Sequence, residues 1–146
     1  IYGPSASILD KRISSDFIFK AASGKNLELK SAGFQKRSYC YSIDCAAAIL
    51  IALMFGKDGD AYNIGHSEST SIREMANIVA LAGNVKLSAA KPTEKELSTF
   101  NPMNNSALDS KKIQHLGYKE TFSVKEGITH TVQILRKCEF ADICSI

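Results

Sequence analysis

The stretch CAAAILIALMF, residues 45–55, limits most strongly what this chain can fold into. It contains no charged side chain, and its length and composition predict a buried helix rather than a strand. The run is well short of the roughly 20 residues that a bilayer-spanning helix needs. A helix that is apolar on nearly all sides must be covered on more than one side. A single small domain can hardly provide that cover.

The composition is that of one globular domain. Apolar residues make up 45% and charged residues 23% of the 146 residues, which argues against a disordered or fibrous chain. The net charge of +3 is spread along the sequence without a block of like charges, so nothing indicates a nucleic-acid partner. No basic segment precedes an apolar run at the start, so we expect no secretion signal and no membrane partner.

The cysteines and histidines show no metal-binding pattern. The cysteines are Cys40, Cys45, Cys138 and Cys144, and the histidines are His66, His115 and His130. No CxxC pair and no Cys/His spacing typical of zinc occurs among them. We therefore expect free thiols in a reducing cytoplasm, histidines with surface or capping roles, and no metal site.

Three amphipathic helices are predicted by apolar spacing and terminal signals. Ile13, Phe17 and Ala21 fall at four-residue steps in the first. The stretch SIREMANIVALAG begins with a Ser-to-Glu capping box at residues 71–74, and a second such box at residues 123–126 begins the last helix. Each box predicts a helix start to within a residue or two.

The remaining elements are short. One set of side chains alternates with another along NLELK and along RSYCYSI, as in half-buried strands, so each stretch predicts a short strand. AYNIG, residues 61–65, predicts a short buried strand. Asp44 stands where an N-cap of the apolar helix belongs, so we assign it a capping and not a catalytic role. Residues 84–106 predict mostly loop with one helical turn after Pro92, and LDSKKIQHLGY predicts a short helix. The fold class is therefore α/β.

The order of several short motifs resembles one known family. These motifs are YGP, DFIxxAxxG, GxQxRSYxYxxD, AYNIG, SIxEMAxIV, LDSxKIxxLGY and SVKEGI. In this order they resemble the C-terminal half of the NAD-dependent nucleotide-sugar epimerases and dehydratases, which are extended short-chain dehydrogenases/reductases. The resemblance covers residues 1–136 and leaves a tail at 137–146. It implies a substrate-binding part with several helices and short strands, and without the Rossmann core.

The motifs that carry catalysis in that family do not occur here. None of the five tyrosines has a lysine four residues later, and the nine glycines form no GxGxxG loop. The resemblance implies that a complete enzyme would oxidise a sugar hydroxyl with tightly held NAD or NADP. For this chain we therefore expect no catalytic residue, no tight cofactor binding and no turnover.

Arg37 is the principal candidate for substrate binding. The resemblance places it against the diphosphate of a nucleotide sugar, and a planar guanidinium can bond two phosphate oxygens at once. The alternative is a solvated arginine at the start of a strand. The resemblance also places Gln35 and the strand of Leu29 beside the nucleotide, although Gln35 can equally finish a turn and Leu29 can belong to any half-buried strand. Arg12 corresponds to an arginine that reaches toward the cofactor in some decarboxylases of the family.

Asn104 and Asn105 stand where many relatives carry a second arginine for the diphosphate. Amide groups donate hydrogen bonds but carry no charge. Either the diphosphate is therefore bound less tightly, or Lys111 or Lys112 supplies the missing positive charge. This departure bears on the identity of the sugar nucleotide more than on its class. The MNNS-LD pattern suggests an enzyme of surface-polysaccharide biosynthesis.

Two functions remain open at this stage. The first is the substrate-binding part of a nucleotide-sugar epimerase or dehydratase, with a nucleotide-diphosphate sugar as ligand and a homo-oligomeric state. The second is a stand-alone binding or interaction module derived from the same fold. A part of a larger fold should leave an apolar patch uncovered around Ile1, the helix at 45–55 and residues 62–64, whereas a module should cover it.

Overall fold

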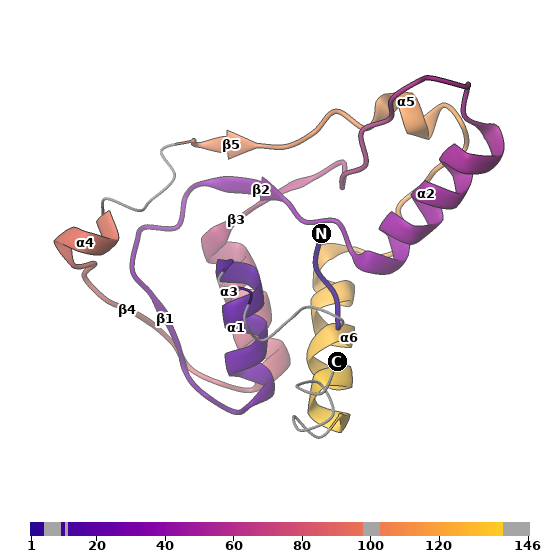
Figure 1. The fold of residues 1–146 in the computed structure, drawn as a ribbon. Helices are drawn as coiled ribbons and strands as arrows, with labels where there is room; N and C mark the ends of the chain where they lie inside the picture. The colour runs from indigo at the N-terminus through magenta and orange to yellow at the C-terminus, as the bar shows by residue number, and fades with distance from the viewer. Residues whose placement is uncertain (5–9, 11, 98–102, 139–146) are drawn as a thin grey trace.

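The body of the molecule is a bundle of three helices. The computed structural model describes residues 1–4, 10, 12–97 and 103–138. Helices α1 (Ile13–Ala22), α3 (Ile72–Gly83) and α6 (Val124–Lys137) pack on one another, as Figure 1 shows. Their inward-facing side chains form the main core. Its members on these helices include Phe17, Ile18, Met75, Val79, Ile128, Val132 and Leu135.

Both predicted capping boxes are confirmed. The Ser71 hydroxyl accepts a hydrogen bond from the Glu74 backbone N–H at 3.1 Å, and the Glu74 carboxylate accepts from the Ser71 N–H at 2.8 Å. Ser123 and Glu126 repeat the arrangement at the start of α6. Each box satisfies backbone donors that the helix itself leaves unpaired. The starts of α3 and α6 are thereby fixed by local sequence.

Two small sheets lie beside the bundle. In the first, β1 (Leu27–Leu29) runs parallel to β4 (Leu87–Ala89). In the second, β2 (Lys36–Ser38) lies between β3 (Ser69–Ser71), which is antiparallel to it, and β5 (Asn105–Ser106), which is parallel. The second sheet therefore joins three segments that are far apart in the sequence.

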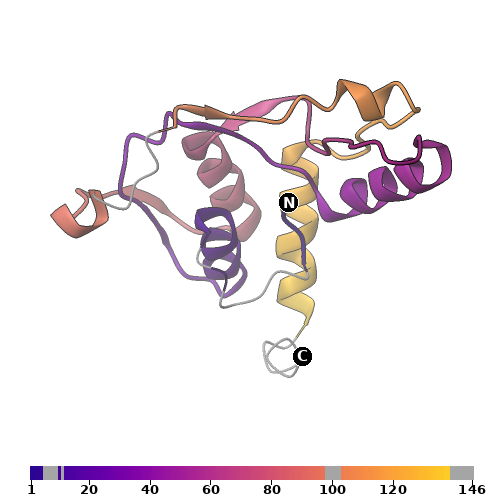
Figure 2. The ribbon, with the colours of Figure 1, turned by 45° about the horizontal axis from the view of Figure 1, so that its top comes forward.

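The apolar stretch forms helix α2 (Ser42–Phe55), which lies apart from the bundle. Figures 1 and 2 show α2 beside the short helix α5 (Lys111–Gln114) at one end of the molecule. Ala48, Ile113 and Tyr118 form a second small cluster between them. The remaining helix, α4 (Glu94–Leu97), is the single turn expected after Pro92.

The capping role predicted for Asp44 is wrong. Helix α2 begins at Ser42, so Asp44 lies inside its first turn and is almost completely buried. Its carboxylate accepts hydrogen bonds from the backbone N–H groups of Thr121 at 2.9 Å and Phe122 at 3.2 Å. Asp44 therefore ties α2 to the segment that leads into α6, a long-range contact that no local pattern reveals.

Two strand predictions also need correction. The alternation in RSYCYSI predicted a strand that continues beyond Ser38, but β2 ends there. The next three residues, Tyr39, Cys40 and Tyr41, are all buried, so they do not alternate between a buried and an exposed face. Residues 61–65, expected to form a strand, have no regular secondary structure. Their apolar members, Tyr62 and Ile64, pack against the cluster around Ala48 instead of joining a sheet.

Three further observations concern the thiols, groups suited to a metal ion and helices long enough for a bilayer. Cys40, Cys45 and Cys138 are free thiols, and Cys144 lies outside the described residues, as does most of the tail predicted at 137–146. No cluster of three or more His, Cys, Asp or Glu side chains suited to a metal ion occurs in the described ranges. In the same ranges, every helix is too short or too polar to cross a bilayer.

Candidate functional site

The sheet around β2 brings the principal candidates together. Lys36 of β2 pairs with Asn105 of β5, and Arg37 pairs with Ser106. The Lys36 backbone N–H also donates to the Asn104 carbonyl oxygen at 2.8 Å. Arg37 and Asn105, which the resemblance assigns to one ligand together with Asn104, therefore lie on adjacent strands, and Asn104 directly precedes β5 (Figure 1).

The Arg37 guanidinium is held by backbone oxygens. Its Nη1 donates to the Lys36 carbonyl at 2.8 Å and to the Met103 carbonyl at 3.0 Å, although Met103 is 66 residues away in the sequence. Within the part of the chain that the structure describes, neither Nε nor Nη2 has a hydrogen-bond partner. The side chain is only partly buried. One edge of the guanidinium is thus oriented by the protein, and the rest can receive an anion.

Gln35 and the loop before it are attached to the start of α3. The Gln35 carbonyl accepts from the Ile72 N–H at 3.0 Å, and the Gly33 carbonyl accepts from the Arg73 N–H at the same distance. Gly33 has a φ of +69°, and a Cβ there would lie 3.0 Å from the Arg73 backbone nitrogen. The close approach and the left-handed backbone both require glycine. This loop therefore holds β2 in place.

Leu29 lies in the other sheet and not beside Arg37. Its side chain is buried, and its carbonyl accepts a hydrogen bond from the Ala90 N–H at 3.0 Å. It lines a hollow of about 220 Å³ together with Arg73, Asn77, Leu87, Ser88 and Ala89. The structure therefore places the Leu29 backbone in the β1–β4 ladder rather than at the Arg37 site.

Arg12 is also separate from the β2–β5 residues. It precedes α1, its side chain is exposed, and Nε donates to the Asp10 carboxylate at 2.8 Å and 3.0 Å. The hydrogen bonds from Arg12 hold the pKa of Asp10 well below its usual range. Nη1 of Arg12 reaches the Ile1 carbonyl at 3.4 Å. Its described contacts thus form a local pair at the start of the helix.

The two lysines considered as charge substitutes already have partners. Lys112 donates to Asp60 at 2.5 Å and to the Ala61 carbonyl at 2.9 Å, and its ammonium lies 4.7 Å from the centre of the Tyr62 ring. Lys111 lies 3.8 Å from the Asp109 carboxylate. Both lysines therefore belong to the α5 end of the molecule.

Arg73 is a second exposed guanidinium that the sequence analysis did not single out. Its Nε donates to the Ala32 carbonyl at 2.9 Å, and its Cζ lies 5.7 Å from the centre of the exposed Phe34 ring. In SIREMAN it has the pattern of any polar residue on the outer face of an amphipathic helix. No local signal distinguishes it.

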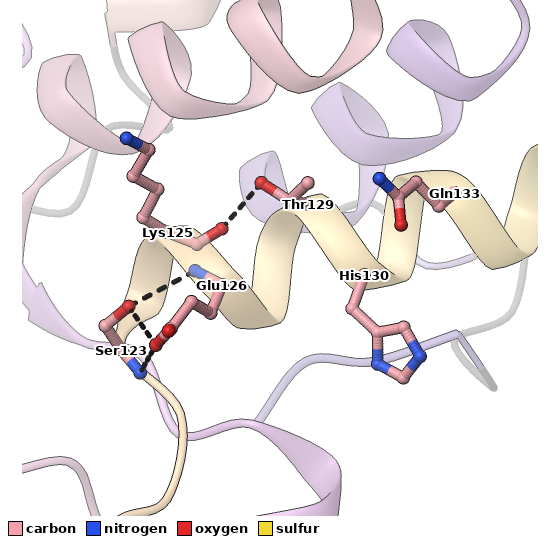
Figure 3. A pocket seen from close by; sticks show the side chains of 6 residues that line it. All are labelled: Ser123, Lys125, Glu126, Thr129, His130 and Gln133. Atoms are coloured by element: carbon pink, nitrogen blue, oxygen red, sulfur yellow. Dashed lines mark hydrogen bonds between the residues drawn. The ribbon is translucent and has the colours of Figure 1, made fainter.

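A wider hollow on the outer face of α6 is part of the helix surface rather than a second site. Figure 3 shows that it is lined by six side chains: Ser123, Lys125, Glu126, Thr129, His130 and Gln133. Ser123 and Glu126 are used in the capping box, and the Thr129 hydroxyl donates to the Lys125 carbonyl at 2.8 Å. His130 Nδ1 lies 2.7 Å from the Tyr41 hydroxyl, so it too has a structural partner.

His66 has a structural role as well. It is buried, and its Nδ1 accepts a hydrogen bond from the Glu68 backbone N–H at 3.1 Å. Of the three histidines, His115 alone is exposed. The expected surface role therefore fits His115, whereas His66 is buried and His130 is a partner of the Tyr41 hydroxyl.

The described helices do not suit the pyrophosphate of a dinucleotide. Such a group binds at a helix N-terminus whose N–H groups and positive dipole face it. Here each of the four long helices, α1, α2, α3 and α6, has a carboxylate in its first turn, and α3 and α6 use it to cap their own N–H groups. An acidic group at that position repels a phosphate. The starts of these four helices therefore do not fit the pyrophosphate of NAD.

Comparison with solved structures gives the fold first. The fold matches that of solved extended short-chain dehydrogenases/reductases. One is the UDP-glucose 4-epimerase of Thermotoga maritima with UDP-glucose, at a TM-score of 0.77 and 23% identity over 93% of this chain and 43% of that one. Another is the WbmF enzyme of Bordetella bronchiseptica with NAD⁺ and UDP, at a TM-score of 0.72 and 23% identity over 92% and 39%.

Sequence comparison then shows similarity to one family. Residues 1–65 match the NAD dependent epimerase/dehydratase family. UDP-glucuronic acid decarboxylase 3 of Arabidopsis thaliana is 30% identical over 87% of this chain and 36% of its own length. The dTDP-D-glucose 4,6-dehydratase of Mus musculus is 26% identical over 94% and 39%. The chain is thus related to this family, and it spans less than half the length of these relatives.

Proposed function

We propose that this chain is the substrate-binding part of an NAD(P)-dependent nucleotide-sugar epimerase or dehydratase. Arg37, with Asn104 and Asn105 beside it, binds the diphosphate of a nucleotide sugar. The observation that carries the proposal is the pairing of β2 with β5, which brings the strand of the oriented Arg37 guanidinium beside a segment with two exposed asparagines. A guanidinium so placed can bond two phosphate oxygens, and amide N–H groups add neutral donors.

The chemistry of the complete enzyme follows from the family. Oxidation of a sugar hydroxyl by hydride transfer to NAD or NADP, with a tyrosine as base, would use residues outside those described here. The role of this chain is to position the sugar for that transfer, which holds the reacting atoms close and aligned. By itself the chain binds but does not turn over its ligand. We propose that this work takes place in the cytoplasm, in sugar-nucleotide or surface-polysaccharide biosynthesis, and the free thiols of Cys40, Cys45 and Cys138 support a reducing compartment.

The uncovered apolar surface favours this function over a stand-alone module. Ile1 is 62% exposed, and Leu53 and Phe55 at the end of α2 are 79% and 61% exposed. A self-sufficient module would cover large side chains of this kind. The surface therefore supports the proposal that this part functions within a larger assembly, in agreement with a homo-oligomeric state.

Calorimetric titration tests the proposal. The chain is titrated with UDP-glucose, dTDP-glucose and NAD, and the titrations are repeated with Arg37→Ala and Lys36→Ala. Lys36 is the matched control, because it carries the same charge one residue earlier and an extended strand points it to the opposite face. Loss of one charge-assisted contact should weaken binding of the preferred sugar nucleotide about 30-fold or more in Arg37→Ala.

Three outcomes would contradict the proposal. The first is binding of NAD without any response to a sugar nucleotide. The second is an equal loss of affinity in the two variants, which would show that only general positive charge matters. The third is unchanged affinity in Arg37→Ala.

A further inference from the structure

The turn that follows α2 carries an aspartate directly before a glycine. Residues 57–60 read Lys-Asp-Gly-Asp, and the Asp60 N–H donates to the Lys57 carbonyl at 3.0 Å, which closes the turn. Gly59 has a φ of +74°, a conformation that glycine adopts at little cost and that the third residue of some turns requires. Asp58 and Gly59 are therefore the two central residues of the turn.

No contact within the described ranges holds the side chain of Asp58 or the backbone N–H of Gly59. Both residues are exposed, and among the described residues neither the Asp58 carboxylate nor the Gly59 N–H has a hydrogen-bond partner. A Cβ built on Gly59 would meet no atom within 4 Å. The peptide unit between the two residues can therefore rotate without the loss of a tertiary contact.

This freedom permits a ring closure within the main chain. A bond between the Gly59 nitrogen and the Asp58 Cγ forms a five-membered succinimide, and one carboxyl oxygen leaves as water. A second water then opens the ring. Attack at the Asp58 Cγ restores aspartate, whereas attack at the Asp58 main-chain carbonyl carbon leaves an isoaspartate, whose main chain runs through Cβ and Cγ. The cycle consumes and releases one water, and glycine hinders it least because it has no Cβ beside the attacking nitrogen.

The next aspartate in the same turn lacks this freedom. Lys112 Nζ donates to the Asp60 Oδ1 at 2.5 Å, and the Ala61 N–H donates to the same oxygen at 3.2 Å. The hydrogen bond from Lys112 lowers the pKa of Asp60, so its carboxyl group stays ionised and its Cγ is a poor target for a nucleophile. Ala61 also has a Cβ beside its nitrogen. Asp60 is thus a matched comparison two residues away.

We propose that Asp58 is a modification site, at which the folded chain converts this aspartate to isoaspartate through attack by the Gly59 nitrogen. The conversion adds one carbon atom to the main chain directly after α2. It lies next to the Lys57 N–H, which donates to the Tyr62 hydroxyl at 3.0 Å, and to the Asp60–Lys112 pair. The modification therefore alters the path by which residues 61–65 leave α2 and run beside α5 (Figure 1).

The test follows the folded chain during incubation for several weeks at pH 7, well below its Tm. Electron-transfer dissociation mass spectrometry locates isoaspartate in the chain. We expect it to accumulate at Asp58, preceded by a species lighter by one water, while Asp60 stays unchanged. Gly59→Ala adds a methyl group beside the attacking nitrogen, and Asp58→Glu requires closure of a six-membered ring. Both variants should lose the product. Lys112→Ala is the control, because it frees Asp60 and should leave the yield at Asp58 unchanged.

A second readout counts the modified chains independently. A methyltransferase specific for isoaspartate transfers a labelled methyl group from S-adenosylmethionine to the new carboxyl group, and the label should rise with incubation time. Far-UV circular dichroism shows whether each variant is folded, and Asp58→Glu decides the comparison if Gly59→Ala unfolds. The proposal is overturned if no isoaspartate forms at Asp58, if Asp58 and Asp60 convert equally, if a folded Gly59→Ala gives the same yield, or if the product forms only after unfolding in urea.

Discussion

Replacing Asp44 tests the contact that attaches α2 to the rest of the molecule. The side chain is almost fully buried, and its carboxylate accepts hydrogen bonds from the Thr121 and Phe122 backbone N–H groups at 2.9 Å and 3.2 Å. Asp44→Ala removes both acceptors. Each partly buried donor left unpaired costs about 1–3 kcal/mol. We expect the free energy of unfolding to fall by about 3 kcal/mol, a large share of the 5–15 kcal/mol typical of a domain.

Urea unfolding at pH 7, followed by circular dichroism, measures this loss. Asp44→Asn keeps the side-chain volume and one acceptor oxygen. Its free energy of unfolding should therefore fall by about half as much as in Asp44→Ala, about 1–2 kcal/mol. Asp58→Ala is the control, because Asp58 is exposed in a turn, and a surface change of this kind usually stays within about 0.5 kcal/mol. If Asp44→Ala costs no more than Asp58→Ala, the assignment of Asp44 as a long-range tie is wrong.

Two further predictions concern the capping boxes and the loop before β2. Hydrogen bonds from the paired serine lower the pKa of Glu74 and of Glu126. The ionised carboxylates therefore stabilise the folded state fully above the pKa that they have in the unfolded chain, and this contribution is lost as pH falls below about 4.5. A urea series from pH 7 to 3 should show this loss, and Ser123→Ala should flatten it; an unchanged slope would contradict the assignment. Gly33→Ala should cost about 2 kcal/mol or more, against about 1 kcal/mol for Gly59→Ala, because both glycines have positive φ but only Gly33 meets the Arg73 backbone. Equal losses in thermal unfolding would show that the close approach is unimportant.

The helices of the bundle could be predicted because their signals are local. Apolar side chains repeat every three or four residues in α1, α3 and α6, and the serine and glutamate of each capping box lie three residues apart. No long-range information is needed for either signal. These three helices form within a residue or two of their expected bounds.

The strand in NLELK was predicted and forms β1, but β3, β4 and β5 could not be predicted, because pairing partners far away in the sequence create them. Strand β3 reads Ser-Thr-Ser, β5 has two residues, and neither shows alternation of apolar and polar side chains. The reverse error occurred at Tyr62 and Ile64, where apolar residues pack on a helix cluster. A short apolar segment alone does not distinguish these two environments.

The candidate site was predicted only through the resemblance. Nothing in the local sequence brings the strand of Arg37 next to that of Asn105, since paired residues of the two strands are 69 positions apart in the sequence. The oriented Nη1 of Arg37 likewise depends on the distant Met103 carbonyl. The uncovered face of α2, by contrast, was indicated by the sequence, because a helix that is apolar on all sides exceeds what so small a domain can cover.

The most direct test of the central claim is a nuclear magnetic resonance titration of the ¹⁵N-labelled chain with UDP. The account predicts that the Arg37 Nε–H and the backbone amides of Asn104 to Ser106 shift together and saturate at one ligand concentration. The amides around Arg12 and the α6 hollow should stay in place. Saturable shifts confined to residues away from β2 and β5, or no saturable shift, would contradict the account.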